Sequence, residues 1–417
     1  MIEIKKLNNH ITLVTEQMPS MRSAAIGIWV RTGAVNETPE IAGVSHFIEH
    51  MTFKGTKTRS AAQLAENMES IGAQMNAFTG KEMTCYYFKS LESNFREGLE
   101  ILLDMFTASV YDAAEMEREK NVIYEEMKMT RDTTDEDAHD TMGELLFRNS
   151  PYGNSIIGTE EVLAGIDRDA LTGYLAAQYV QDSIVIAVAG KFDEQMVTEM
   201  VEGKLSHLKE SKESPLLTSE ALEPAYTVKA RDIEQTHICM ATRTVKLDDP
   251  DYYAHRVLSC IMGGGMSSRL FQNVREQKGL AYSVYSSCNP FSEDGYYNIY
   301  AGVSHDRIAE AIGAIREELL TLGEKGVTDE EIAKAKTQIK TSYIFGQESV
   351  NGRMVGIGQA CVLLGRVRSQ DEVLASIDAV DQEAVGRAIR MIADPGCYSA
   401  VAVTNKEFDL GTLVQGA

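Results

Sequence analysis

The chain has 417 residues, of which 44% are hydrophobic and 24% charged, a composition typical of globular proteins with a substantial core. This length fits two domains of roughly 200 residues each. With 62 acidic and 40 basic residues, the formal charge is −22. That charge argues against a nucleic-acid-binding protein, which needs a basic face for the phosphates, and against docking on an anionic membrane surface. An acidic protein can attract basic peptides, but the charge is also accounted for by general solubility alone.

The first 18 residues lack the apolar core of about 7–15 residues that defines a secretory signal peptide. No uncharged apolar run approaches the ~18 residues that a membrane span requires. The six cysteines, at positions 85, 239, 260, 288, 361 and 397, are scattered and form no CxxC pair. We interpret them as buried, reduced thiols. These features predict a cytoplasmic protein without a membrane partner.

The sequence contains an internal repeat. The run EVLAGID at 161–167 recurs as EVLASID at 372–378, an offset of 211 residues. Each copy is followed by a helical stretch and then by a β-branched run, at 183–193 in the first case and at 399–409 in the second, an offset of 216. Two matches in the same order at nearly the same offset indicate that the chain consists of two homologous halves.

The stretch between the halves is rich in Lys, Glu, Ser and Pro, as linkers are. We therefore predict a first domain at 1–206, a linker at 207–225 and a second domain at 226–417. The predicted strands lie, in chain order, at 11–15, 24–32, 75–78, 85–91, 183–189, 237–245, 282–288, 296–303 and 398–403. Strands that follow one another so closely favour antiparallel pairing with helices packed on the sheet. The predicted fold class is α+β, with two tandem domains of this kind.

The first half carries the sequence GVSHFIEHMTF at 43–53, whose apolar residues indicate a partly buried helix. His46 and His50 are four residues apart, so on a helix both imidazoles lie on one face and can hold the same ion, for which zinc is well suited. Glu49 projects beside them toward the place of a bound water, as a general base requires. This HxxEH pattern is that of the inverted zincins, although such histidines can also serve only as hydrogen-bonding groups.

A second segment, EMEREKNVIYEEM at 115–127, is strongly helical by propensity. Glu119 and Glu126 are seven residues apart, two helical turns, and therefore lie on one face. A helix this acidic is commonly a solvated surface. The residues alone therefore leave open whether one of these carboxylates is the third metal ligand.

Together these segments resemble the insulinase/pitrilysin family of metallopeptidases, especially its short members related to mitochondrial processing peptidase. The resemblance spans the whole chain, duplication included. It rests on the HxxEH run with the MTFKGT that follows it, and on a glutamate 76 residues after the second histidine in an ERExxxxxxE context. It implies that His46, His50 and Glu126 bind one zinc ion per chain and that Glu119 supports a ligand. Histidine–carboxylate sites also accept Co²⁺ or Mn²⁺.

The resemblance also implies where a peptide substrate binds. Asn76, Ala77 and Phe78 match the family's edge strand beside the zinc, although by themselves they could form an ordinary half-buried strand. The second half has no HxxEH. Its Arg275 and Tyr282 match, in their spacing of seven, the family's pair that contacts the substrate backbone and the reacting carbonyl. By composition alone, these two residues would only end a helix and begin a strand.

We therefore expect a zinc endopeptidase that cleaves peptides or unfolded segments held as a β-strand in an enclosed chamber. In the expected mechanism a water on the zinc attacks the scissile carbonyl, with Glu49 as base and then acid. The alternative is a non-catalytic structural or partner subunit of the same family. Such members lose ligands of the HxxEH set, whereas His46, Glu49, His50 and Glu126 are all present here.

The long, four-domain members of the family carry the zinc in the first domain and the Arg/Tyr pair in the fourth, and their halves close like a clamshell. The present chain, with two domains, corresponds to one half-clamshell. We therefore expect a homodimer in which Arg275 and Tyr282 complete the zinc site of the partner chain. The alternative is a monomer whose own two domains meet around the substrate.

Overall fold

The computed structural model describes residues 2–212, 217 and 222–416. The chain forms two compact units, each built from three segments. The first unit comprises Met1–Met127, Asn154–Leu216 and Ile344–Ser369. The second comprises Lys128–Gly153, Leu217–Tyr343 and Gln370–Ala417.

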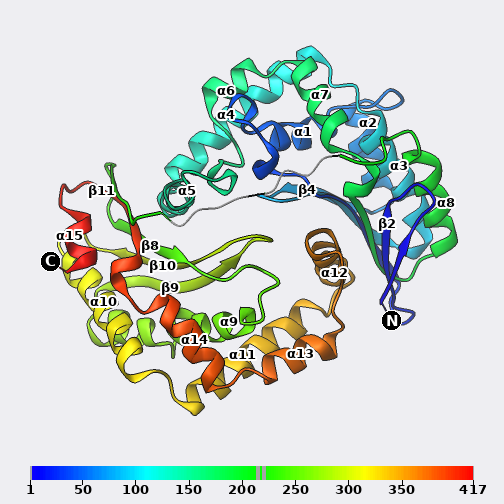
Figure 1. Ribbon diagram of the computed structural model, residues 1–417. Helices are drawn as coiled ribbons and strands as arrows, with labels where there is room; N and C mark the ends of the chain where they lie inside the picture. The colour runs from blue at the N-terminus through cyan, green and yellow to red at the C-terminus, as the bar shows by residue number, and fades with distance from the viewer. Residues whose placement is uncertain (1, 213–216, 218–221, 417) are drawn as a thin grey trace. The chain divides into compact units, whose positions relative to one another are not determined.

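The first unit is organised around a six-stranded sheet, of which β2 and β4 are labelled in Figure 1. The strand order is β1-β2-β6-β3-β5-β4. All neighbouring strands are antiparallel except β2 and β6, which run parallel. β4 lies at one edge of the sheet and pairs with β5. The strands are β1 (Ile2–Lys6), β2 (Thr12–Gln17), β3 (Ser23–Val30), β4 (Gln74–Thr79), β5 (Thr84–Leu91) and β6 (Ile184–Gly190).

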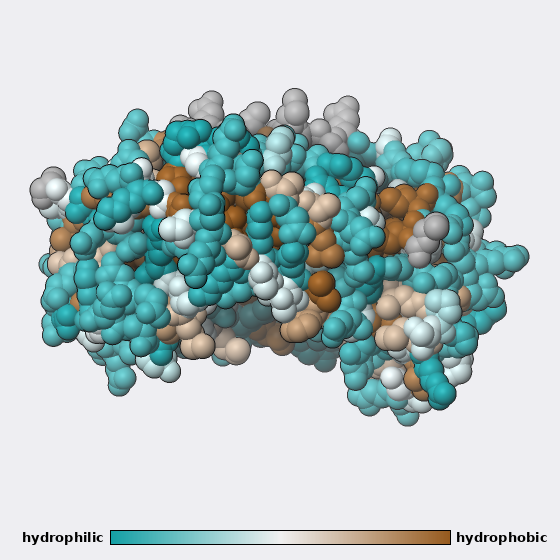
Figure 2. All heavy atoms as spheres, turned by 90° about the horizontal axis from the view of Figure 1, so that it is seen from below, coloured by the Kyte–Doolittle hydropathy of each residue, from teal (hydrophilic) through white to brown (hydrophobic). Residues whose placement is uncertain are grey.

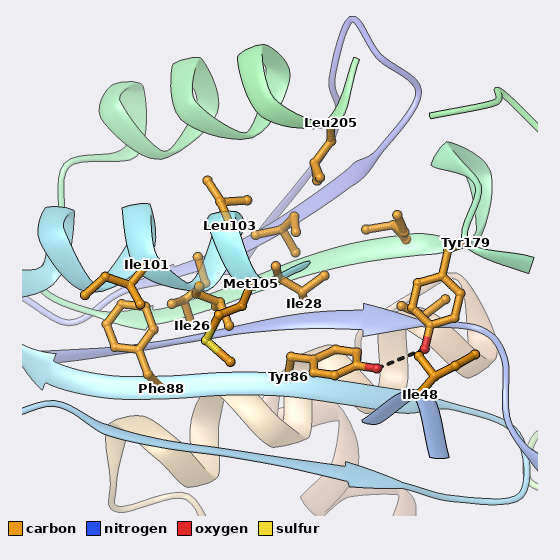
Figure 3. Packing of buried hydrophobic residues seen from close by; sticks show 14 of the residues in the cluster. Ile26, Ile28, Ile48, Tyr86, Phe88, Ile101, Leu103, Met105, Tyr179 and Leu205 are labelled. Atoms are coloured by element: carbon orange, nitrogen blue, oxygen red, sulfur yellow. Dashed lines mark hydrogen bonds between the residues drawn. The ribbon is translucent and has the colours of Figure 1, made fainter. Parts of the chain in front are cut away.

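The central strands of this sheet are buried on both faces, which explains their nearly continuous apolar sequences. Ile26 and Ile28 of β3 point into a large core formed with the helices (Figure 3). Ala25 and Trp29 of the same strand point to the opposite face. In the large core the hydroxyls of Tyr86 and Tyr179 are hydrogen-bonded at 3.0 Å, so these two buried polar groups are satisfied.

The helices of the large core come from the first half of the sequence. They are α1 (Val44–Thr52), α2 (Ala61–Ser70), α3 (Phe95–Ala108), α4 (Ala113–Asp132), α6 (Glu160–Gly165), α7 (Arg168–Gln178) and α8 (Glu194–Leu205). Short 3₁₀ helices lie between the strands and the helices of this unit: η1 (Ala34–Asn36), η2 (Pro39–Ile41), η3 (Glu92–Asn94) and η5 (Gln181–Ser183).

The second unit repeats this plan. Its five-stranded sheet has the order β7-β11-β8-β10-β9, which matches β2-β6-β3-β5-β4 strand for strand, including one parallel pair at the same place. The strands are β7 (Tyr226–Ala230), β8 (Thr236–Arg243), β9 (Ala281–Pro290), β10 (Gly295–Val303) and β11 (Ser399–Thr404). The predicted duplication and the predicted α+β class with two mainly antiparallel sheets are confirmed.

Most helices of the second unit come from the second half of the sequence. They are α9 (Tyr252–Gly263), the π-helix η6 (Phe271–Gln277), α10 (Ile308–Lys325), α11 (Asp329–Gly346), α13 (Gln370–Asp378), α14 (Gln382–Ile392) and α15 (Leu410–Gln415). The 3₁₀ helices η4 (Pro151–Gly153) and η7 (Pro395–Cys397) complete the unit.

Two helices are exchanged between the halves of the sequence. α12 (Val350–Leu364), from the second half, packs on β2, β3 and β6 of the first sheet (Figure 1). α5 (Thr134–Leu146), from the first half, packs on β8 and β11 of the second sheet. Each compact unit thus takes one helix from the other copy of the repeat.

The compact units therefore differ from the predicted limits at 206 and 226 in two segments, Lys128–Gly153 and Ile344–Ser369. A sequence repeat marks where each copy begins, but it carries no information on which sheet a helix covers. The limits of the two copies stay a prediction. The predicted linker falls partly outside the described residues, at 213–216 and 218–221.

All six cysteines are free thiols, but the prediction that all are buried is wrong: Cys85, Cys239 and Cys361 are buried, Cys260 and Cys288 are half-buried, and Cys397 is exposed. Hydrophilic residues cover most of the face seen in Figure 2, and apolar residues appear there in separate patches. Within the described part of the chain, no helix combines the length and the apolar character needed to cross a bilayer. The cytoplasmic location stays a prediction.

Candidate metal centre

The helix that carries the HxxEH sequence, α1, owes its position to its apolar side. Val44, Phe47, Ile48 and Met51 are buried in the large core of the first unit. Their spacing of three and four residues places them on one face of the helix. His46, Glu49 and His50 therefore lie on the other side.

The beginning of α1 is fixed by a buried carboxylate. Glu37 accepts hydrogen bonds from the backbone N–H groups of Gly43 at 2.6 Å and Ser45 at 2.8 Å. Gly43 adopts a left-handed conformation, with φ of 92°, and a Cβ there would lie 2.6 Å from the Ile157 carbonyl oxygen. A glycine is thus required at this position. Glu37 satisfies backbone donors that the helix itself cannot satisfy.

α4 brings the third ligand candidate to the histidines. Glu126 Oε1 lies 3.7 Å from His46 Nε2, and Glu126 Oε2 lies 3.5 Å from His50 Nε2. One ligand atom from each of the three residues can be chosen so that all lie within 4.8 Å of one another. The structure thus brings together the three predicted metal ligands. Among the described residues, no other group of His, Cys, Asp and Glu meets this condition.

This donor set fits a zinc ion. Ligand atoms about 2.1 Å from a tetrahedral ion lie roughly 3.4 Å from one another, close to the 3.7 and 3.5 Å that separate the Glu126 oxygens from the two histidines. Two imidazole nitrogens and one carboxylate also form a ligand combination that zinc adopts in catalytic sites, with a fourth position left for water or substrate. Burial lowers the pKa of His46 to about 4, and the adjacent His50 adds to this effect, so this imidazole is neutral. Burial also acts to lower the pKa of His50, but the hydrogen bonds to Glu119 and Glu126 outweigh it and raise that pKa to about 9, so a metal must displace a proton from this ring.

Glu119 lies two helical turns before Glu126, and its carboxylate contacts the Nδ1 atom of His50. Its Oε1 lies 2.9 Å from His50 Nδ1, and its Oε2 lies 2.6 Å from the ammonium of Lys54. Burial opposes ionisation of Glu119, but the hydrogen bonds to His50 and Lys54 outweigh it and lower the pKa of the carboxyl. A carboxylate at Nδ1 fixes the ring so that Nε2 faces the metal position. Glu119 thus lies where a supporting residue is needed.

Glu49 is not part of the ligand group. Its Oε2 accepts a hydrogen bond of 2.5 Å from the Thr79 hydroxyl at the end of β4. Burial raises the pKa of Glu49, and the Thr79 hydrogen bond opposes that rise. A carboxylate beside the ligands, but not among them, can accept a proton from a water at the open position.

β4 presents a free edge close to these residues. Asn76 and Ala77 lie in the middle of the strand, and the Ala77 N–H donates to the Asn76 side-chain oxygen at 2.9 Å. The Phe78 ring packs edge-on against Trp29, with 5.6 Å between centroids, on the opposite face of the sheet. Phe78 therefore contributes its side chain to packing, and what this strand can offer a peptide is mainly its backbone edge.

Arg275 and Tyr282 belong to the second unit. Arg275 lies in η6, and Tyr282 lies near the start of β9. The Arg275 guanidinium sits 5.1 Å from the centroid of the Tyr282 ring and 4.6 Å from that of Phe271, so the two predicted residues are brought together by cation–π stacking. Tyr282 is 76% exposed, which leaves its hydroxyl accessible to a ligand.

Sequence reasoning missed three residues of this centre: Glu37, Lys54 and Thr79. Lys54 belongs to the MTFKGT run that follows the histidines, and Thr79 directly follows the predicted strand that ends at Phe78. Glu37 lies outside them, and no sequence pattern marks it.

Comparisons with known proteins identify the relatives of this chain. A family model described as "Insulinase (Peptidase family M16)" matches residues 12–160, and one described as "Peptidase M16 inactive domain" matches residues 165–339. A protein of Bacillus subtilis (strain 168), named an uncharacterized zinc protease, is 40% identical over 392 residues, which cover 94% of this chain and 96% of the relative.

Two solved structures share the fold. A structure described as a peptidase M16 inactive domain from Pseudomonas fluorescens has a TM-score of 0.90 at 18% identity and covers 98% of both chains. A protease from Helicobacter pylori has a TM-score of 0.88 at 20% identity, over 97% of this chain and 99% of the other. The chain therefore belongs to the insulinase family, peptidase family M16. Further relatives, from Streptomyces coelicolor among others, are also named zinc proteases.

Proposed function

We propose that this protein is a zinc-dependent endopeptidase that cleaves peptides or unfolded segments docked as an additional strand on β4. The observation that supports this most is the placement of one carboxylate, Glu126, at 3.7 and 3.5 Å from the Nε2 atoms of His46 and His50. Glu49 lies beside this group without belonging to it. Ligands and base are thus separate residues, as hydrolysis by an activated water requires.

In the proposed mechanism, His46, His50 and Glu126 hold the zinc ion, and Glu119 keeps the His50 ring in place. The chemistry that zinc supplies in such sites is Lewis acidity, which lowers the pKa of a bound water to about 7. Glu49 accepts the proton of the attacking water and then passes it to the nitrogen of the leaving amine. The free edge of β4 holds the substrate backbone in line with these groups.

We further propose that the protein acts as a homodimer, in which Arg275 and Tyr282 of one protomer complete the zinc site of the other. The pair is preassembled by stacking, and Tyr282 is exposed. A phenol and a guanidinium at the scissile carbonyl would donate hydrogen bonds to the oxygen that gains negative charge. Two copies facing each other in this way would enclose the substrate in a chamber.

The first prediction separates the base from the ligands. Glu49→Gln should keep one zinc per chain but reduce kcat for peptide hydrolysis by about 10²–10⁴-fold, because only proton transfer is removed. Glu126→Gln should lose both stoichiometric zinc and activity, because a ligand is removed. Elemental analysis and hydrolysis of a peptide library, read by mass spectrometry, measure both quantities.

Glu125→Gln is the matched control, since it removes the same charge from an exposed neighbour on the same helix. It should retain both zinc and activity. Near-full turnover in Glu49→Gln would contradict the mechanism. A wild-type protein that holds no stoichiometric zinc and cleaves no peptide would instead identify a non-catalytic member of the family.

A further inference from the structure

The last residue of β4, Thr79, contacts the catalytic base directly. Its Oγ1 donates a hydrogen bond of 2.5 Å to Oε2 of Glu49. The two residues are 30 positions apart in the sequence and come from different elements, β4 and α1. The contact therefore depends on how the strand and the helix are packed together.

The alternation of side chains along β4 explains why this hydroxyl reaches α1. Met75 and Ala77 point to the face of the sheet that carries the large core, where α1 lies, whereas Phe78 packs on the opposite face. Because residues two apart in a strand share a face, Thr79 points to the same side as Ala77. Thr79 thus approaches Glu49 without any departure from regular strand geometry.

Thr79 also lies on the edge that we propose as the peptide-binding edge. The hairpin between β4 and β5 is closed by a hydrogen bond of 2.8 Å from the Gly80 N–H to the Met83 carbonyl, and Thr79 pairs with Thr84. In an antiparallel ladder the backbone groups of alternate residues point toward and away from the partner strand. The N–H and C=O groups of Ala77 and Thr79 therefore point outward, and the Ala77 N–H indeed donates to the Asn76 side chain instead of the ladder.

We propose that Thr79 is a positioning residue that aligns the Glu49 carboxylate for proton transfer and ties this alignment to the strand that binds the peptide. The Thr79 hydroxyl donates its hydrogen bond to Oε2 of Glu49. Oε1 is then the oxygen that accepts the proton of the attacking water. That proton then moves from Oε1 to the leaving nitrogen, while the Thr79 hydroxyl keeps its own proton throughout. This inference rests on the proposed peptidase function.

The test compares two substitutions at one position. Thr79→Val removes the hydroxyl but keeps the branched shape, and should lower kcat by about 10- to 100-fold with KM and zinc content nearly unchanged, because a misplaced base loses alignment with the water. Thr79→Ser keeps a hydroxyl and should restore most of kcat. Thr58→Val is a matched control, because Thr58 also donates to a carboxylate, that of Asp104 at 2.9 Å, but outside the metal centre.

Two further measurements show whether Thr79 acts through Glu49. In a double-mutant cycle, Thr79→Val introduced into Glu49→Gln should cause little additional loss of kcat, because the group that Thr79 aligns is already disabled. Crystal structures of the metal-free Thr79→Val and wild-type proteins should differ in the orientation of the Glu49 side chain.

An unchanged kcat in Thr79→Val, or a loss that Thr79→Ser does not recover, would overturn the inference. Additive losses in the double mutant would also overturn it, since Thr79 would then act independently of Glu49. If the wild-type protein itself hydrolyses no peptide, the proposed function fails instead. The orientation of Glu49 in the metal-free crystals then still decides whether Thr79 positions it.

Discussion

Glu37 is 6% exposed, yet it carries a carboxyl group whose two oxygens accept backbone N–H groups at the start of α1. Burial raises the pKa of Glu37 to about 7, although the hydrogen bonds from Gly43 and Ser45 work in the opposite direction. The residue thus combines a helix-capping role with an unfavourable desolvation of its charge.

This conflict predicts how stability depends on pH. The folded-state pKa of about 7 lies above the ordinary value of 4.5, so the folded protein binds a proton at Glu37 more tightly than the unfolded chain does. The Glu37 contribution to the free energy of unfolding should therefore fall as pH rises from about 4.5 to 7, by up to about 3 kcal/mol, and stay constant above that range.

Glu37→Gln cannot ionise and should lack this pH dependence, while its weaker capping adds an offset that does not change with pH. Calorimetric unfolding of both metal-free proteins between pH 5 and 8 measures the difference. The difference between the two free energies of unfolding should shift in favour of Glu37→Gln as pH rises. A difference that is constant across this range would show that Glu37 titrates at its ordinary pKa.

Part of the metal centre can be predicted from sequence because the geometry of one helix suffices. The spacing of His46 and His50 places both rings on one face whatever the rest of the fold does. The third ligand was predicted by its distance along the chain from His50, which the family resemblance provided. Glu37 and Thr79 escaped prediction because their contacts with α1 depend on tertiary packing. Neither a threonine in a strand nor a glutamate in a loop has a local pattern that indicates such a role.

At the scale of elements, the nine predicted strands all correspond to strands of the structure, shifted by no more than a few residues at their ends. The two that were missed, β1 and β7, lie at sheet edges and are largely exposed or half-buried. A strand with no buried face needs no alternation of apolar residues, so its sequence resembles a loop. The buried strands β3 and β6, by contrast, were evident from their continuous apolar runs.

The packing of α12 on the first sheet depends on a glycine. A Cβ added at Gly358 would lie 2.2 Å from Nε1 of Trp29, a ring that is fully buried. At Gly356, in the same helix, the nearest atom to an added Cβ is the end of the flexible Gln347 side chain, at 3.1 Å. The two glycines thus differ in whether their neighbour can move.

Gly358→Ala should therefore destabilise the protein by about 1–3 kcal/mol, because the Trp29 ring or the helix must shift within a packed core. Gly356→Ala should be neutral or stabilising by up to about 1 kcal/mol, because alanine favours the helix over glycine. Denaturant unfolding of both variants, followed by the fluorescence of Trp29, provides the measurement. Equal stabilities of the two variants would indicate that α12 is not held closely against Trp29.

At the scale of the whole molecule, the proposed dimer predicts complementation between inactive variants. Glu49→Gln protein lacks the base, and a protein with Arg275→Ala and Tyr282→Phe lacks the carbonyl-contacting pair, so each should be inactive alone. If the pair acts on the partner's zinc site, a mixed dimer has one site with an intact base and an intact pair. Activity should then reappear when the two proteins exchange subunits, up to about one quarter of the wild-type value for random mixing of equal amounts.

The control is the same mixture before exchange, or after cross-linking of each parent protein, which should remain inactive. If base and pair act within one chain, no chain in the mixture contains both, and activity should not return. Analytical ultracentrifugation of the wild-type protein gives the oligomeric state independently. A monomer at working concentrations would contradict the shared site.

The exchange of α5 and α12 has a consequence for how the protein is made. The last strand of the first sheet, β6, ends at residue 190, but the helix that covers the sheet's second face spans 350–364. Until the ribosome has released that helix, Trp29, Val185 and Ala187 lack the cover that α12 provides on this face. Domains of longer proteins generally fold one after another during synthesis. Here the nascent amino-terminal half must stay soluble with an apolar sheet face uncovered while most of the other half is translated. Premature termination between the repeats therefore leaves a fragment that is prone to aggregation or to capture by chaperones.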